Sequence, residues 1–89
     1  MIKPTKPLEE YEKYGFRKCK GSVGKLNCYY LCVSRGCEII FISPAMIDIL
    51  TWEDDDPRIH KNPNCRYKDN RTAIEIICEM EMNGLLKFE

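Results

Sequence analysis

The stretch CYYLCVSRGCEIIFI, residues 28–42, decides the fold because it holds two strand-like segments separated by a turn. Aromatic and β-branched residues, which are frequent in strands, fill both segments, CYYLCV at 28–33 and CEIIFI at 37–42. The residues between them, SRG at 34–36, are typical of a turn. We therefore predict an antiparallel hairpin with a two-residue turn at Arg35-Gly36.

The two-residue period of a strand divides this hairpin into two faces. One face is rich in cysteine, and the other is mainly aliphatic. The first face is predicted to carry Cys28, Tyr30, Cys32, Cys37, Ile39 and Phe41. The second is predicted to carry Tyr29, Leu31, Val33, Ile40 and Ile42.

On the N-terminal side of the hairpin, the sequence predicts one short helix and one short strand. The segment PLEEYEKY at 7–14 has a proline suited to a first helical turn, and Gly15 ends the helix. Residues 16–19 are expected to form a short strand. The segment KGSVGKLN at 20–27, with two glycines, is expected to be a loop.

On the C-terminal side, Ser43 and Pro44 resemble the N-cap and first position of a helix that reaches about Trp52. Residues 53–70 show no strong periodicity, and an irregular segment of that length in a small domain is expected to be functional or held by a ligand. A last helix is predicted at 73–82.

That last helix has a clear start and a clear stop. Thr72 and Glu75 have the capping-box spacing, and Asn83-Gly84 is a typical helix end. Residues 85–88 are expected to add an edge strand. The sequence as a whole predicts an α+β fold in one domain, 1–89, with a small antiparallel sheet of three or four strands and two or three helices.

Composition indicates an ordinary globular protein. Hydrophobic residues make up 44% of the chain and charged residues 31%, with a formal net charge of zero. The charges alternate along the chain, since residues 1–27 and 57–72 are mainly basic whereas 28–56 and 73–89 are mainly acidic. We expect separate charged faces, which suit docking onto a charged macromolecule.

The N-terminal segment lacks the apolar core of a secretory signal, and no apolar run is long enough to cross a membrane. We therefore expect a cytoplasmic protein. Its six cysteines are expected to stay reduced, because that compartment disfavours disulfides. The roles open to them are core residue, metal ligand and reactive thiol.

The segment RIHKNPNC at 58–65 holds the only histidine of the chain, five positions before a cysteine. Together with the two cysteines that flank the hairpin turn, it has the ligand number and short within-pair spacings of a structural zinc site. The predicted ligands are Cys32, Cys37, His60 and Cys65. Four protein ligands would close the coordination shell and pin the irregular segment onto the sheet.

A rival pair, Cys19 and Cys28, flanks the loop at the opposite end of the sheet and competes for the two strand ligands. Cys28 and Cys32 cannot serve one metal together, because four positions on a strand span about 13 Å. The other interpretation is that the cysteines are core residues and His60 is a solvated loop side chain. Cys78, within the apolar pattern of the last helix, is expected to be a small buried hydrophobe.

No catalytic constellation is recognisable, so enzymatic activity is not expected. The sequence contains no phosphate-binding glycine loop, no GxSxG and no HExxH, and the acidic run EDDD at 53–56 lacks the spacing of a calcium loop. That run is either a solvated loop or an acidic patch that contacts a basic partner. The predicted partner-binding residues are Trp52, Glu53, Asp54, Asp55 and Asp56.

The possible zinc set, the EDDD run and the short cytosolic chain together resemble the small anti-CRISPR proteins of phages, in particular a zinc-containing inhibitor of a type II effector nuclease. Such a resemblance implies a stoichiometric inhibitor that binds the nuclease in the bacterial host cytoplasm and blocks nucleic-acid loading. The alternative function is a zinc-dependent nucleic-acid-binding or transcription-modulating phage protein. Zero net charge and the acidic run disfavour direct nucleic-acid binding.

Overall fold

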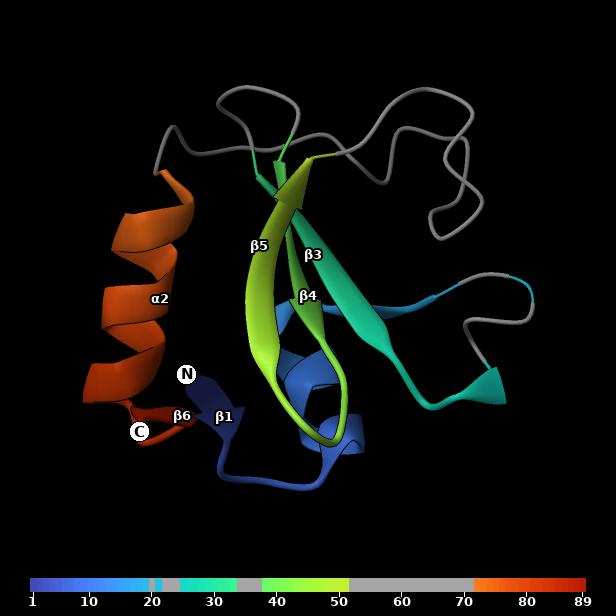
Figure 1. Cartoon of the computed structure of the whole chain (residues 1–89), viewed down its shortest axis with the longest axis horizontal. Helices are drawn as coiled ribbons and strands as arrows, with labels where there is room; N and C mark the ends of the chain where they lie inside the picture. The colour runs from blue at the N-terminus through green and yellow to red at the C-terminus, as the bar shows by residue number, and fades with distance from the viewer. Residues whose placement is uncertain (20, 22–24, 34–37, 52–71) are drawn as a thin grey trace.

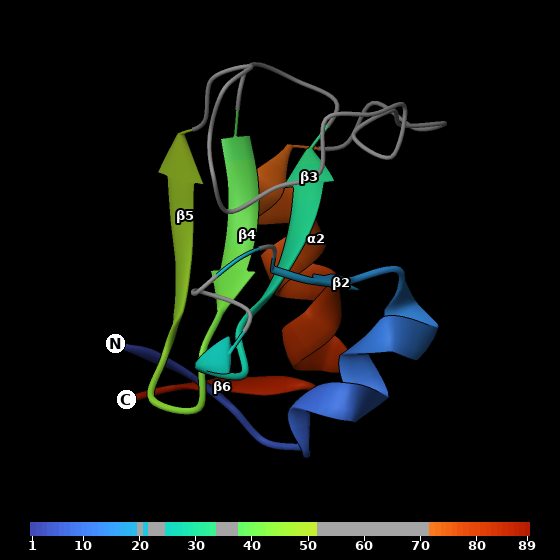
Figure 2. The same ribbon diagram turned by 90° about the vertical axis from the view of Figure 1, so that its right-hand side faces the viewer.

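The computed structural model describes residues 1–19, 21, 25–33, 38–51 and 72–89, and it has an α+β fold built on an antiparallel sheet. Six strands form the sheet in the order β2-β3-β4-β5-β1-β6. The elements are β1 (Ile2–Pro4), η1 (Leu8–Tyr14), β2 (Arg17–Lys18), β3 (Tyr29–Val33), β4 (Glu38–Ile42), β5 (Ile47–Thr51), α2 (Ala73–Met82) and β6 (Leu86–Phe88). Figure 2 shows β5, β4 and β3 side by side with α2 behind them, so the helix covers one face of the sheet.

The central hairpin has the predicted register. Cys32 lies opposite Ile39 and Tyr30 lies opposite Phe41, as a two-residue turn at Arg35-Gly36 requires. The turn itself lies outside the described residues. Strand period and register together place each side chain of β3 and β4 on the face that the alternation predicted.

The helix predicted after Ser43 is wrong, because the chain forms β5 there. Ser43 does accept hydrogen bonds as an N-cap would, from the amides of Ala45 (3.3 Å) and Met46 (3.2 Å), but these bonds close a turn. The Ser43 amide then donates to the Met46 carbonyl at 2.9 Å. Serine and proline favour the first two positions of a β-turn as strongly as a helix start, so this local signal is ambiguous.

Pairing with β4 is what decides the outcome for Ile47–Thr51. All five residues of β5 lie opposite residues of β4, from Ile42↔Ile47 to Glu38↔Thr51. A lone helix of about seven residues would be marginal in water, whereas the strand satisfies the backbone groups of β4.

The sheet is wider than predicted because both chain ends join it. β1 lies between β5 and β6, and β6 is the expected edge strand. The amino group of Met1 donates to the Glu89 carbonyl at 2.7 Å, and the Glu89 amide donates to the Met1 carbonyl at the same distance. The two termini are therefore neighbours, as Figure 1 shows.

The last helix begins and ends as predicted. The Thr72 hydroxyl accepts from the Glu75 amide at 3.2 Å, and the Glu75 carboxylate accepts from the Thr72 amide at 3.2 Å, which is a complete capping box. At the other end, Gly84 has φ of 73°, a left-handed conformation that favours glycine. The Leu85 amide reaches the Met80 carbonyl at 2.8 Å and closes a Schellman motif.

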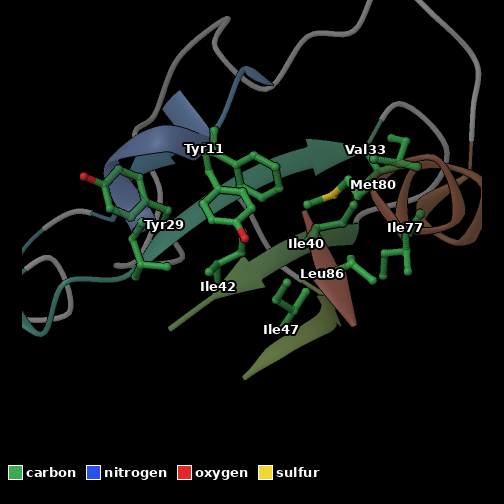
Figure 3. Close-up of a cluster of buried hydrophobic side chains, with 13 residues drawn as sticks. Tyr11, Tyr29, Val33, Ile40, Ile42, Ile47, Ile77, Met80 and Leu86 are labelled. Atoms are coloured by element: carbon green, nitrogen blue, oxygen red, sulfur yellow. The ribbon is translucent and has the colours of Figure 1, made fainter. Parts of the chain in front are cut away.

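The larger core lies between the sheet and the helices η1 and α2 (Figure 3). It unites residues of both helices with one face of the hairpin. The members labelled in Figure 3 are Tyr11, Tyr29, Val33, Ile40, Ile42, Ile47, Ile77, Met80 and Leu86. A second, smaller cluster lies on the opposite face of the sheet and contains no residue of η1 or α2.

Candidate functional site

The second cluster is the cysteine-rich face that the alternation predicted. We call it the cysteine face, and it consists of Cys19, Cys28, Tyr30, Cys32 and Ile39, with Phe41 and Leu50 packed against it. Each of its five core members is buried. Three cysteines thus share one buried, largely apolar surface, and the prediction for Cys28 and Cys32 is confirmed.

Cys19 and Cys28 are brought together by the pairing of β2 with β3. The Cys19 amide donates to the Cys28 carbonyl at 2.8 Å, one step beyond the pair Lys18↔Tyr29. The two residues are therefore directly opposed, which places their side chains on the same face. Neither cysteine is in a disulfide. This is the rival pair of the sequence analysis.

The Cys28 thiol is held in its protonated form. Burial raises its pKa above the ordinary value of 9.0, because the apolar surroundings disfavour the thiolate. Its sulfur also lies 3.8 Å from the Leu26 carbonyl oxygen, a weak S–H donor contact. A reactive thiol needs the opposite environment, one that lowers the pKa and exposes the sulfur.

Cys32 differs from this pair, since it is disulfide-bonded. The bond departs from the expectation that all six cysteines are reduced. That expectation rested on the cellular compartment, which says nothing about how closely the fold brings two sulfurs together. A disulfide sulfur is not a thiolate ligand, so zinc binding by Cys32 would require its reduction first.

The remaining members of the preferred zinc set, Cys37, His60 and Cys65, lie outside the described residues. Within residues 1–19, 21, 25–33, 38–51 and 72–89, no group of three or more His, Cys, Asp and Glu side chains is arranged to hold a metal ion. A structural zinc therefore stays a prediction. The predicted partner-binding residues, Trp52 and the acidic run at 53–56, also fall outside the described part of the chain.

The interpretation of Cys78 as a core residue is wrong, because the residue is exposed. The buried residues of α2 are Ala73, Ile76, Ile77 and Met80. At 100° per residue, Cys78 lies on the opposite side of the helix from that stripe. Because the segment is rich in apolar residues, its composition alone did not distinguish the buried side of the helix from the exposed side.

Two large apolar side chains accompany Cys78 on the outer face of α2. Ile74 is 61% exposed and Met82 is 86% exposed. Their spacing of four residues on each side of Cys78 aligns the three along the helix. We call these three residues the α2 ridge. Helical periodicity, applied residue by residue, would have found it, since 74, 78 and 82 all fall outside the buried stripe.

Carboxylates border the α2 ridge. Glu81 lies on one side of it, and Glu75 and Glu79 lie on the other, as the helical period requires. The last turn of α2 carries no basic residue. The outer surface of the helix therefore combines exposed apolar groups with negative charge.

Comparisons with known proteins do not place this chain in a family. Searches against protein-family models, curated proteins and solved structures return no significant match. Among the helices of the described residues, none has the length and apolar character needed to span a membrane.

Proposed function

We propose that this protein acts by binding another protein, without turnover, and that the outer face of α2 forms part of the contact surface. The observation that carries the proposal is the α2 ridge, in which Ile74 and Met82 are 61% and 86% exposed on a regular helix. Exposed apolar groups rimmed by charge are typical of protein interaction sites.

The charge around the ridge supports a partner with a basic surface. Glu75, Glu79 and Glu81 border the apolar side chains, and complementary potentials favour association and suppress wrong partners. The same charges disfavour self-association through this face, because two copies would bring like charges together.

A nucleic-acid-binding channel has the required chemistry, since it uses lysine and arginine to contact phosphates. The resemblance to anti-CRISPR proteins suggests such a partner, a type II effector nuclease. In this proposal the acidic helix occupies part of a channel that otherwise receives nucleic acid. Inhibition then follows from occupancy alone, with no catalytic group on this protein.

The test is an inhibition titration against a type II effector nuclease. The wild-type protein is expected to inhibit at about one molecule per nuclease. Ile74→Glu and Met82→Glu are each expected to weaken inhibition at least about tenfold, equivalent to about 1.4 kcal/mol. Leu26→Glu is the matched control, because Leu26 is similarly exposed (69%) but lies outside α2.

The outcomes separate the candidate functions. Equal inhibition by wild type and both α2 variants would remove this face from the interface. Absence of inhibition by the wild type, combined with salt-sensitive shifting of duplex or single-stranded DNA in a gel, would favour the alternative of a nucleic-acid-binding module. Thermal melting of each variant establishes that it is folded.

A further inference from the structure

The opposed cysteines of the cysteine face have the geometry of two ligands to one metal ion. Directly opposed residues on antiparallel strands have Cβ atoms about 4.5–5.5 Å apart. Two zinc–sulfur bonds of about 2.3 Å at a tetrahedral angle place the sulfurs about 3.8 Å apart. Cys19 and Cys28, linked by the 2.8 Å hydrogen bond between their backbones, can reach that separation by side-chain rotation alone.

We propose that Cys19 and Cys28 together bind a thiophilic divalent cation of the zinc class, with both sulfurs as ligands. Soft thiolates select such ions over magnesium or calcium. The pair supplies half of a four-coordinate shell. This inference is independent of the proposed protein-binding function, because the cysteine face and the α2 ridge lie on different elements.

The state of the other cysteines supports this choice. Cys32 is disulfide-bonded, whereas neither Cys19 nor Cys28 is in a disulfide although they face each other. Cys32 is also too far along β3 to join the site, since four strand positions separate it from Cys28 by about 13 Å. Cys78 is exposed on α2 and has no part in the cysteine face.

Binding is a proton-for-metal exchange. Each S–H bond breaks as a sulfur–metal bond forms, and the two protons pass to solvent with no change of oxidation state. Because protons are released when the metal binds, a lower proton concentration favours the bound state, and binding is expected to strengthen as pH rises.

Cobalt(II) is the probe, because thiolate-to-cobalt charge transfer gives an absorption band that reports sulfur ligands. Metal-free wild-type protein, kept without reductant so that Cys32 stays oxidised, is expected to develop the band with about one equivalent of cobalt. Zinc should then displace the cobalt and abolish it. Uptake should release about two protons in weak buffer. Absence of the band in the wild type overturns the proposal.

Two variants assign the ligands. Cys19→Ser/Cys28→Ser should lose the charge-transfer band, whereas Cys78→Ser, which removes an exposed thiol, should keep it. A double variant that retains the wild-type band overturns the proposal. If the double variant does not fold by circular dichroism, zinc titration of the wild type followed by amide NMR decides the question. The amide resonances of Cys19 and Cys28 must shift, and shifts confined to other residues overturn the assignment.

Discussion

Tyr11 and Leu85 are 74 positions apart in the chain, yet the Tyr11 hydroxyl donates a hydrogen bond to the Leu85 carbonyl oxygen. The same hydroxyl accepts from the Thr5 amide at 3.2 Å. Tyr11 is fully buried, and its ring meets Phe16 edge to face at 5.8 Å between centroids. This one hydroxyl therefore links η1 to the segment between α2 and β6.

Tyr11→Phe is expected to lower the free energy of unfolding by about 1 kcal/mol, because it removes both hydrogen bonds of the hydroxyl and leaves the Thr5 amide and the Leu85 carbonyl with the 3.3 Å bond between them. Urea denaturation measures the change. Thr5→Val is the control, since the Thr5 hydroxyl bonds the Gly84 carbonyl in an exposed position and should matter less. Equal stability of Tyr11→Phe and wild type would show that the phenol is not a structural fastener.

Thr72→Ala is expected to cost about 1 kcal/mol of stability, since it removes the acceptor for the Glu75 amide at the start of α2. Thr72→Ser keeps an oxygen in the same place and should stay close to wild type. The comparison of the two urea midpoints isolates the cap from any general effect of the site. A loss of the same size in both variants would contradict the capping role.

The sequence predicted those parts of the fold that rest on strong local patterns. The capping box of α2, the Gly84 stop and the two faces of the β3–β4 hairpin each follow from a few neighbouring residues. The helix predicted from Ser43-Pro44 was wrong because this pair fits a turn as well as a helix start. Only the pairing of β5 with β4 decides between the two. β1 was missed because three residues, IKP, become a strand only through partners at 47 and 86–88.

The positions of the described cysteines were likewise predicted correctly where a local pattern was sufficient, and incorrectly where it was not. Strand alternation placed Cys28 and Cys32 on one face correctly, and the flanking-loop spacing brought Cys19 to Cys28 as the rival pairing expected. Whether Cys32 forms a disulfide depends on what the fold brings near it in space, and the spacing of cysteines along the chain does not reveal this. Cys78 was misassigned because apolar composition was read without the helical angle, and that angle also identifies the α2 ridge.

Thiol labelling is expected to rank the cysteines by their exposure. In native protein, Cys78 should be alkylated first, and Cys19 and Cys28 much more slowly, because they are buried and burial raises the pKa of the Cys28 thiol. Cys32 should react only after a reductant is added. Mass spectrometry of the digested protein measures each site. Labelling of Cys32 without reductant would show that its disulfide is absent from the protein as purified, as a reducing cytoplasm predicts.

The last prediction concerns alkaline pH. The Tyr29 hydroxyl donates to a Glu12 carboxylate oxygen at 3.2 Å. Burial, followed by this bond and the negative charges of Glu12 and Glu9, raises the pKa of Tyr29 above its ordinary value of 10.0. The folded state therefore binds the phenolic proton more tightly than the unfolded state does. The protonated Tyr29 hydroxyl therefore contributes stability that is fully present below pH 10. This contribution is lost as the pH rises through the pKa that Tyr29 has in the folded protein.

Glu12→Gln keeps a hydrogen-bond acceptor but removes the charge, so it should lower the pKa of Tyr29 toward 10.0. Phenolate absorbance, taken as the difference between each protein and its Tyr29→Phe counterpart, isolates this residue from the other tyrosines. Lys13→Gln is the control, as it changes a charge in the same helix that has no part in the shift. Burial remains in the Glu12→Gln variant, so the pKa should fall only part of the way. A titration curve identical to that of the wild type would mean that Glu12 does not raise the pKa of Tyr29, and that burial and the charge of Glu9 do.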